Sequence, residues 1–490
     1  MRMSSKGWLA VMVLATLIEI GCGETYRPTI IPNPVTPPAP QNFHATFTAN
    51  TNGAANPGSA LEIDVSGDTK AGQANMGIGP VHLAIQPGSV SQSTRVYTAN
   101  NTNDSVSVFT ASSSLGTIGT PVTINLTPGS QPVFVTSTES TSMYVANAGN
   151  NTVNALSGST NAVTATICLN SNNPQCPGVT PSADGIHPWA MAETPDGHKL
   201  YVVNRDSSNV TSINSVDRSI ASVIPTGATP QWAAARNDSK RVYVLAADGT
   251  LSTIDSEYTS GTVDTVLSTQ QVGAGANFFA YDGRLNRLYI PFPTGTTVAI
   301  YNVALDPPTL MNTIDLTQPI TPGGNDAPCP GGCSPVSATA LQDGTRAYFA
   351  SFNVDPNSAN CTSTQVVGQA LQPCIALQVT VLDETSNTVR SVIRVPEFAQ
   401  GLQGLTTIVN CADPTQVRFR FVATSSADSS KVYVSSCDAG SIETIKTSND
   451  SFILALTEPV SILNPIRLNP GSPTPTYPPP QTPQFIVAGP

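Results

Sequence analysis

The stretch that decides the fold is His187-Pro-Trp-Ala-Met-Ala-Glu-Thr-Pro-Asp-Gly-His-Lys-Leu-Tyr-Val-Val-Asn204. It contains an apolar run that begins beside a proline, a polar Pro-Asp-Gly turn, and a second apolar run centred on a tyrosine. Gly, Asn and Asp suit such a turn because hairpin turns need residues that tolerate positive φ. The stretch therefore predicts two antiparallel β-strands joined by a hairpin.

The tyrosine-centred strand recurs along the chain, at Tyr97, Tyr144, Tyr201, Tyr243, Tyr289, Tyr348 and Tyr433. The shorter gaps between these tyrosines match the roughly 40–50 residues of a four-stranded propeller blade. The long gap after Tyr348 has room for another blade, but we interpret it as one blade with two insertions and with strands at 377–382 and 389–395. The sequence thus predicts an all-β fold, a seven-bladed β-propeller with mostly four-stranded antiparallel blades.

Composition supports this fold and argues against one class of partner. Charged residues make up only 11% of the chain, which suits short strands with polar turns better than long, salt-bridged helices. The net charge is −11, and no run of Lys or Arg occurs. Nucleic-acid binders usually carry a basic stripe that neutralises phosphates. We therefore expect no nucleic-acid partner.

The first 22 residues have the features of a targeting segment. Arg2 and Lys6 precede an apolar run, residues 8–18, that is too short to span a bilayer. The following Gly21-Cys22 resembles a bacterial lipobox, with Glu19 where such motifs usually carry Leu. The resemblance implies lipidation of Cys22 and contact with a membrane through the lipid anchor only. An ordinary signal peptide is the alternative.

Prolines mark both ends of the propeller. Residues 23–42 are predicted to be an extended linker, residues 43–463 the propeller, and residues 464–490 a disordered tail. A ring of blades must join its last blade to its first, because unpaired strand edges would otherwise remain. We expect residues 61–65 to be the outer strand of the final blade, beside residues 442–445; residues 452–456 are the competing segment for that place.

Eight cysteines remain after Cys22, in four couples of near neighbours. Disulfides are the default interpretation in an oxidising compartment, and the repeat places each couple within one loop or blade. A zinc site would need a tetrahedral Cys or His set, and no His lies near the most closely spaced couple. We expect no metal and no cofactor. The predicted disulfides are Cys168–Cys176, Cys329–Cys333, Cys361–Cys374 and Cys411–Cys437.

The innermost strand of each blade lines a central channel, and polar residues stand at or near the start of six of these strands. Placement around one axis could bring them to a single mouth, where His82 and His187 could form a metal or acid–base pair. The alternative is that they are channel-lining groups satisfied by water and neighbours. The repeated tyrosines are interpreted as packing between neighbouring sheets. The candidate ligand-binding residues are His82, Gln131, His187, Gln231, Asn277 and Arg418.

The repeated pattern resembles the YVTN family of β-propeller repeats, with near-complete signatures in Tyr144-Val-Ala-Asn147 and Tyr201-Val-Val-Asn204. Related propellers include lactonases, dehydrogenase subunits and binding scaffolds, so the resemblance implies a fold and not one activity. No catalytic motif is found, and no catalytic residue is assigned. We expect an exported lipoprotein, in the periplasm or at the cell surface, that acts as a non-enzymatic binding or scaffold module for a protein, glycan or envelope component. The alternative is a lactonase-like hydrolase with its site at the channel mouth. A third interpretation is an electron-transfer or dehydrogenase accessory, against which the absence of a haem motif argues.

Overall fold

The structure is a computed structural model, and the residues it describes all belong to one unit. The predicted signal peptide, the linker, Cys361 and residues 464–480 lie outside the described residues. No helix occurs among the residues described, and none could therefore cross a membrane as a long apolar helix. The structure describes residues 45–53, 55–86, 94–112, 117–137, 142–170, 176, 184–355, 374–396, 398–399, 411–413, 417–456 and 481–489.

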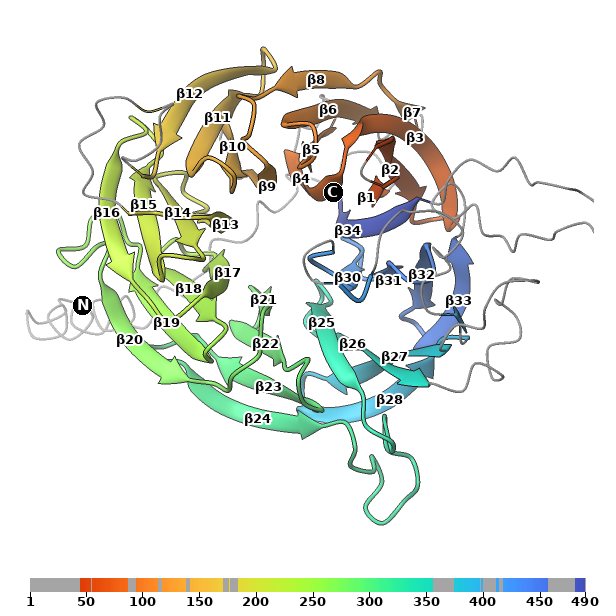
Figure 1. Ribbon diagram of the computed structural model, residues 1–490. Coiled ribbons are helices and arrows are strands. Elements are labelled where there is room, and N and C mark those ends of the chain that lie inside the picture. Colours follow the sequence, from red (N-terminus) through yellow and green to blue (C-terminus); the bar gives the residue numbers. More distant parts are fainter. Residues whose placement is uncertain are drawn as a thin grey trace, which may run out of the picture. The chain divides into compact units, whose positions relative to one another are not determined.

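The strands form eight antiparallel sheets arranged as blades around one axis (Figure 1). From the axis outward, blade A consists of β34 (Thr482–Ala488), β1 (Ala45–Thr51), β2 (Pro57–Asp64) and β3 (Thr69–Ile78). Blade B consists of β4 (Pro80–Gln86), β5 (Thr94–Asn100) and β6 (Ser105–Ser112), with β7 (Thr117–Ile118) and β8 (Val122–Asn125) both paired to β6. Blade C consists of β9 (Pro132–Ser137), β10 (Ser142–Asn147), β11 (Thr152–Ser157) and β12 (Ala162–Cys168). Blade D consists of β13 (Pro188–Glu193), β14 (Lys199–Asn204), β15 (Asn209–Asn214) and β16 (Ile220–Pro225).

The remaining four blades follow the same order. Blade E consists of β17 (Pro230–Ala235), β18 (Arg241–Ala246), β19 (Thr250–Asp255) and β20 (Val266–Gln271). Blade F consists of β21 (Ala280–Asp282), β22 (Arg287–Pro291), β23 (Thr297–Asn302) and β24 (Thr309–Asp315). Blade G consists of β25 (Ser334–Ala340), β26 (Arg346–Asp355), β27 (Cys374–Asp383) and β28 (Thr388–Arg394), with β29 (Phe398–Ala399) against β27. Blade H consists of β30 (Phe421–Ser425), β31 (Lys431–Ser436), β32 (Ser441–Lys446) and β33 (Ser451–Leu456).

The propeller has eight blades, so the predicted count of seven is wrong. The prediction of four-stranded antiparallel blades is confirmed, and the gap between Tyr348 and Tyr433 does contain one interrupted blade. The blade that was missed is blade A, because phenylalanine replaces the repeated tyrosine there. Phe47-Thr-Ala-Asn50 in β1 takes the place that Tyr97-Thr-Ala-Asn100 has in β5.

The ring closes through the C-terminal strand. In Figure 1, β34 in blue lies beside β1 in red, and the two strands pair antiparallel. The predicted tail is therefore a strand over Thr482–Ala488. The prediction for residues 61–65 is also wrong, because β2 pairs with β1 and β3 inside its own blade, while β32 pairs outward with β33. The N-terminal sheet needs the end of the chain to cover the inner edge of β1.

The asparagine that ends the second strand of several blades orders the turn that follows it. Asn100 Nδ2 donates to Ser105 Oγ at 3.0 Å and to Ser107 Oγ at 2.9 Å. Asn204 Nδ2 makes the equivalent pair of bonds, to residues five and seven positions later, at 2.8 Å each. Both asparagines are fully buried, so these bonds offset the desolvation of the amide N–H groups. The repeated Asn is thus a structural residue of the hairpin.

The repeated tyrosines join neighbouring blades, which confirms the interpretation that they pack between sheets. All seven side chains are fully buried, and six of their hydroxyls bond to the turn between the third and fourth strands of the next blade. In blade D, Tyr201 donates to Asp264 Oδ1 at 2.8 Å, and Lys199 Nζ lies 2.6 Å from Asp264 Oδ2. Tyr433 and Lys431 make the same contacts with Asp68, which ties blade H to blade A.

The Tyr433 contact gives a test of ring closure. We expect Tyr433→Phe to lower the free energy of unfolding by about 1.5–3 kcal/mol, because the hydroxyl donates to the Asp68 carboxylate at 3.1 Å. Tyr301→Phe is the matched control: Tyr301 is 7% exposed, and its hydroxyl has no hydrogen-bond partner within the described part of the chain. Urea unfolding of both variants measures the difference. Equal losses would show that the hydroxyl of Tyr433 does not hold the ring closed.

Candidate functional site

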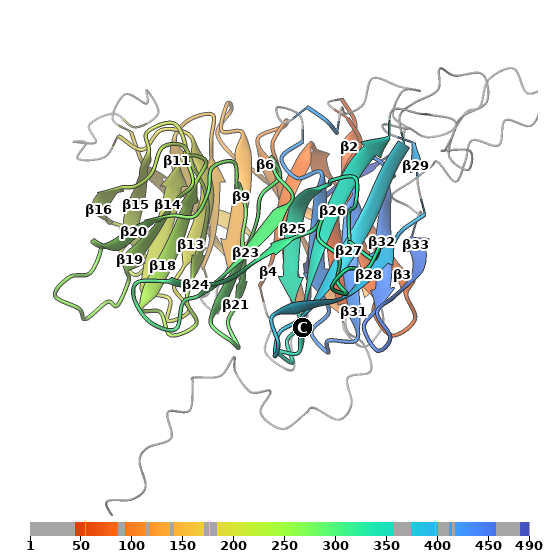
Figure 2. The same cartoon turned by 90° about the horizontal axis from the view of Figure 1, so that it is seen from below.

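One end of the ring gathers the insertions. Because neighbouring strands run antiparallel, the turns between second and third strands and the connections between blades lie at the end where the inner strands begin. We call this end the mouth face; Figure 2 views the ring from the side. The disulfides Cys168–Cys176, Cys329–Cys333 and Cys411–Cys437 all lie in such segments, with Cα–Cα separations of 6.1, 5.8 and 5.9 Å. These three predicted bridges are confirmed. Cys374 is disulfide-bonded too, but its predicted partner Cys361 lies outside the described residues.

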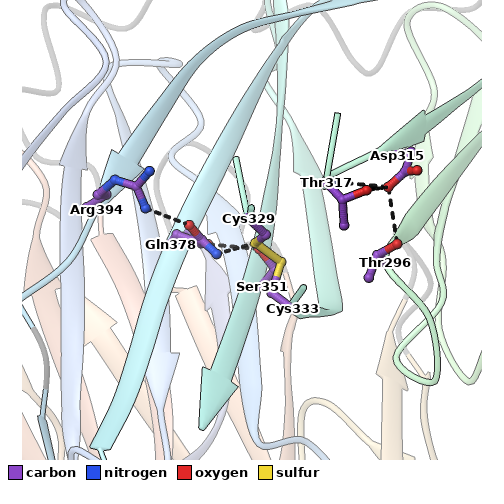
Figure 3. The surroundings of a disulfide bond; sticks show 8 residues. All are labelled: Thr296, Asp315, Thr317, Cys329, Cys333, Ser351, Gln378 and Arg394. Atoms are coloured by element: carbon purple, nitrogen blue, oxygen red, sulfur yellow. Dashed lines mark hydrogen bonds between the residues drawn. A yellow bond between two sulfur atoms is a disulfide. The ribbon is translucent and has the colours of Figure 1, made fainter. Parts of the chain in front are cut away.

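The Cys329–Cys333 bridge shows how an insertion is held at the mouth face. Both half-cystines are buried, and Gln378 Nε2 from β27 donates to Cys329 Sγ (Figure 3). Arg394 Nη1 from β28 in turn donates to Gln378 Oε1 at 3.2 Å. The insertion between β24 and β25 is therefore fixed to blade G by polar contacts as well as by its own covalent bridge.

A repeated β-bulge sends backbone carbonyls toward the channel. In β9, β13 and β17 the pairing skips the residue after the first proline, namely Val133, Trp189 and Gln231. A bulged residue has no partner in the ladder, so its carbonyl is free to accept elsewhere. Arg418 supplies the donors: Nη1 lies 2.7 Å from the Trp189 carbonyl and 3.5 Å from that of Val133, and Nη2 lies 3.5 Å from that of Gln231. One guanidinium thus links three blades to the segment that precedes β30.

Aromatic rings surround the same guanidinium. Its carbon lies 4.4 Å from the ring centroid of Trp189, 4.9 Å from that of Phe419, 5.6 Å from that of Phe134 and 5.7 Å from that of Trp232. Ring faces attract a cation that has lost part of its water. Burial, with a contribution from the charge of Arg205, lowers the pKa of Arg418 to about 9, so the group is still a cation at neutral pH.

The inner strands also bring together a group of aromatic side chains, which we call the channel aromatic cluster. His82 stacks on Phe134 at 3.9 Å and packs against Phe485 at 4.2 Å. Its Nδ1 accepts the Val135 N–H at 3.4 Å. Burial and the charge of Arg418 hold the pKa of His82 well below its usual value, so the imidazole is neutral. The members of the cluster are His82, Phe134, Trp232, Phe278, Phe419 and Phe485.

His187 lies in a more polar setting beside Trp189. Its Nδ1 is 3.1 Å from Asp206 Oδ2, and its ring centroid is 5.4 Å from that of Trp189. Burial lowers the pKa of His187; the Asp206 carboxylate opposes this effect, and Arg205 and Arg418 add to it. The His187 side chain is about one-third exposed, at 34%. A neutral imidazole oriented by a carboxylate is therefore accessible at the mouth.

The six predicted channel residues divide into two groups. Arg418 connects three others, through its bond to the Gln231 carbonyl and its charge effects on His82 and His187. Gln131 and Asn277 are instead exposed at the start of their blades. The backbone N–H of Gln131 donates to Asp104 Oδ1 at 2.7 Å, which orders the loop before β9. No group of three or more His, Cys, Asp or Glu suited to a metal occurs among the residues that the structure describes.

Sequence reasoning missed the aromatic and second basic components of this site. Trp189 and Trp232 follow the first proline of their inner strands, and Pro483-Gln484-Phe485 repeats the arrangement of Pro230-Gln231-Trp232. Arg205 directly follows the motif asparagine in blade D. A search for aromatic residues one or two positions after each strand-initiating proline would have found most of the rings.

Comparisons with known proteins agree with the propeller fold. Residues 59–221 match the family model described as a lactonase with a 7-bladed β-propeller; the match covers less than half of the chain. No curated protein matches. Similar solved structures include apo AztD from Citrobacter koseri (12% identity, 91% of this chain and 98% of that chain, TM-score 0.53). A candidate 6-phosphogluconolactonase from Bacteroides fragilis (12%, 86% and 98%, TM-score 0.42) and hydrazine synthase of Kuenenia stuttgartiensis (14%, 66% and 78%, TM-score 0.43) are also similar. The chain is thus a β-propeller with a partial likeness to the lactonase family.

Proposed function

We propose that this protein is an exported, lipid-anchored propeller that binds a component of the cell envelope at the mouth face without transforming it. The observation that carries the proposal is the Arg418 guanidinium, held by carbonyls of three blades and surrounded by aromatic rings. Such an arrangement offers a fixed charge and flat apolar surfaces, which are the elements of recognition.

Two further features support this function. The disulfide-bonded insertions lie at the same face as Arg418, and rigid scaffolds commonly carry their binding residues on such loops. Disulfides are also consistent with an oxidising compartment outside the cytosol. The Cys411–Cys437 bridge directly brackets the segment that bears Arg418, so the covalent framework positions the binding residue.

The second candidate function is a lactonase-like hydrolase, and the His187–Asp206 pair is the observation that favours it. A neutral imidazole with its Nδ1 beside a carboxylate can act as a general base toward water, while the nearby arginines could stabilise an oxyanion. In this function His187 would be essential for turnover. Binding without catalysis would need only the charge of Arg418 and the aromatic side chains around it.

Envelope binding is tested by sedimenting the protein with isolated bacterial cell envelopes, after removal of the signal peptide and with Cys22→Ser so that no lipid anchor retains it. We expect Trp189→Ala to reduce the retained fraction at least tenfold, because the indole contacts Arg418 and forms part of the mouth. Tyr258→Ala is the control, since this aromatic side chain is 50% exposed in a turn at the opposite end of the ring. Equal retention of the three proteins would contradict the proposal.

The hydrolase is tested in parallel by titrating acid release from a panel of simple lactones. Turnover by the wild-type protein that disappears in His187→Gln would establish the second candidate and overturn the first. We expect no difference in acid release between the wild-type protein, His187→Gln and a protein-free solution.

A further inference from the structure

Two guanidinium groups converge on one indole at the mouth face. The carbon of the Arg205 guanidinium lies 4.8 Å from the Trp189 ring centroid, and that of Arg418 lies 4.4 Å from it. Arg205 comes from the turn between β14 and β15, whereas Arg418 comes from the segment before β30. The two charges are close enough for Arg205 to contribute to the lowered pKa of Arg418. Folding therefore brings like charges from distant parts of the chain together.

Neither group has a carboxylate partner within the described residues. Within the described residues, the hydrogen bonds of the Arg418 side chain all go to backbone carbonyls, and Arg205 Nε is buried with no partner. Arg420 shows the usual solution in this protein, because it holds both oxygens of Asp438 at 2.6 and 2.9 Å. In a chain of net charge −11, carboxylates are plentiful, yet none of those in the described part of the chain pairs with either arginine. An unpaired buried donor costs free energy unless a ligand accepts from it.

We infer that Trp189, Arg205 and Arg418 form an anion site for a ligand that carries a carboxylate or phosphate on a flat or apolar body. This inference rests on the proposed function, since it names the ligand class for the same mouth. The planar guanidinium matches both oxyanions in a two-bonded geometry. The oxyanion would accept from Arg205 and Arg418 and reduce their mutual repulsion. The body of the ligand would pack on the indole and on Phe419.

His187 supplies an internal reporter for the bound anion. The charged groups that act on its imidazole are Asp206, Arg205 and Arg418. The two arginines lower the pKa of His187, so an anion between them would cancel part of that effect and raise the pKa. A substitution that merely loosens the loop would not produce a ligand-dependent change. Titration of His187 by NMR, with and without ligand, therefore distinguishes binding from a structural role.

The direct test is calorimetric titration of the mature protein with glucuronate, benzoate and inorganic phosphate, with glucose as the neutral counterpart of glucuronate. We expect at least one anion to bind, glucose not to bind, and Arg205→Gln to weaken binding at least tenfold. Arg390→Gln is the control, because it removes the same charge from a side chain that is 53% exposed and pairs with Asp450 on another part of the ring. If glucuronate and benzoate bind but phosphate does not, the ligand carries a carboxylate. The opposite result would show that it carries a phosphate.

Two results would overturn the inference: no binding of any of the three anions, or binding that Arg205→Gln leaves unchanged. The Arg205 side chain is half-buried and donates no hydrogen bond within the described residues, so Arg205→Gln is the safer variant; Arg418→Gln is compared only if its unfolding curve matches the wild type. If anions do not bind but envelope retention still depends on Trp189, the ligand class is wrong and the proposed function stands. If anions bind but envelope retention is absent, the proposed function is wrong and the anion site stands.

Discussion

Removal of residues 481–490 is expected to abolish cooperative folding of the whole ring. These residues supply β34, the inner strand of blade A, which pairs along the full length of β1. Phe485 packs against His82 and Phe419, and Ile486 is 2% exposed. The loss of one buried large side chain commonly costs 3–5 kcal/mol, so loss of the strand should exceed about 5 kcal/mol. That amount is comparable to the total stability of many domains.

The truncation can be controlled by adding the missing strand back. A synthetic peptide of residues 481–490 should pair with the exposed edge of β1 and restore a single unfolding transition in calorimetry. A peptide in which Phe485 is replaced by Ser should restore less, because that ring contacts two blades besides its own. A truncated chain with an unchanged melting temperature would show that β34 does not close the ring.

The protein is expected to be markedly less stable at pH 8 than at pH 5. Burial, with a contribution from Asp64, raises the pKa of Glu62 to about 7, and burial raises that of Glu443 to about 7. The side chains are 0% and 2% exposed, and both oxygens of Glu62 and one of Glu443 lack a partner within the described residues. Each of these two carboxyl groups is therefore protonated in the folded protein at pH 5. The cost of ionising it appears as the pH rises.

The sign follows from proton binding by the two states. Between about pH 4.5 and 7 the folded protein holds protons that the unfolded chain has released, so stability falls as pH rises through this window and levels off above it. A pKa difference of one unit between the folded and unfolded states corresponds to about 1.4 kcal/mol. Each glutamate therefore changes the free energy of unfolding by on the order of 3 kcal/mol across this pH window. Burial also raises the pKa of Glu384, which shares a site with Asp282, and this pair acts in the same direction.

Glutamine variants separate this effect from general pH dependence. Glu443→Gln should stabilise the protein at pH 8 by on the order of 3 kcal/mol and change little at pH 4.5, because glutamine never ionises. Glu257→Gln is the control, since Glu257 is a 38%-exposed partner of Lys240. Chemical unfolding at pH 4.5, 6 and 8 gives the comparison.

Below pH 4 the stability of the protein should fall again. Burial of Asp255 opposes its ionisation, but hydrogen bonds from Ser260 and Thr262 outweigh this effect and lower its pKa.

The sequence by itself determined the blade and its local chemistry. Proline-led inner strands, Asp-Gly hairpins and the buried tyrosine follow from short-range requirements of φ, hydrogen bonding and burial, and they predict the repeated hairpins of blades B to H. The three described cysteine couples were also predictable, because each closes a loop that local strands already define. These features depend on residues that are near one another in the chain.

Only the tertiary structure decided the number of blades and the composition of the site. Blade A combines strands from opposite ends of the chain, and its signals were weak: Phe47 in place of tyrosine, and Pro483-Gln-Phe485 beyond a proline-rich segment. The aromatic cluster and the two-arginine site join residues from several blades, whose meeting depends on ring curvature and on the repeated bulge. Local sequence fixes each bulge, but the closure of the ring determines which side chains meet at the axis.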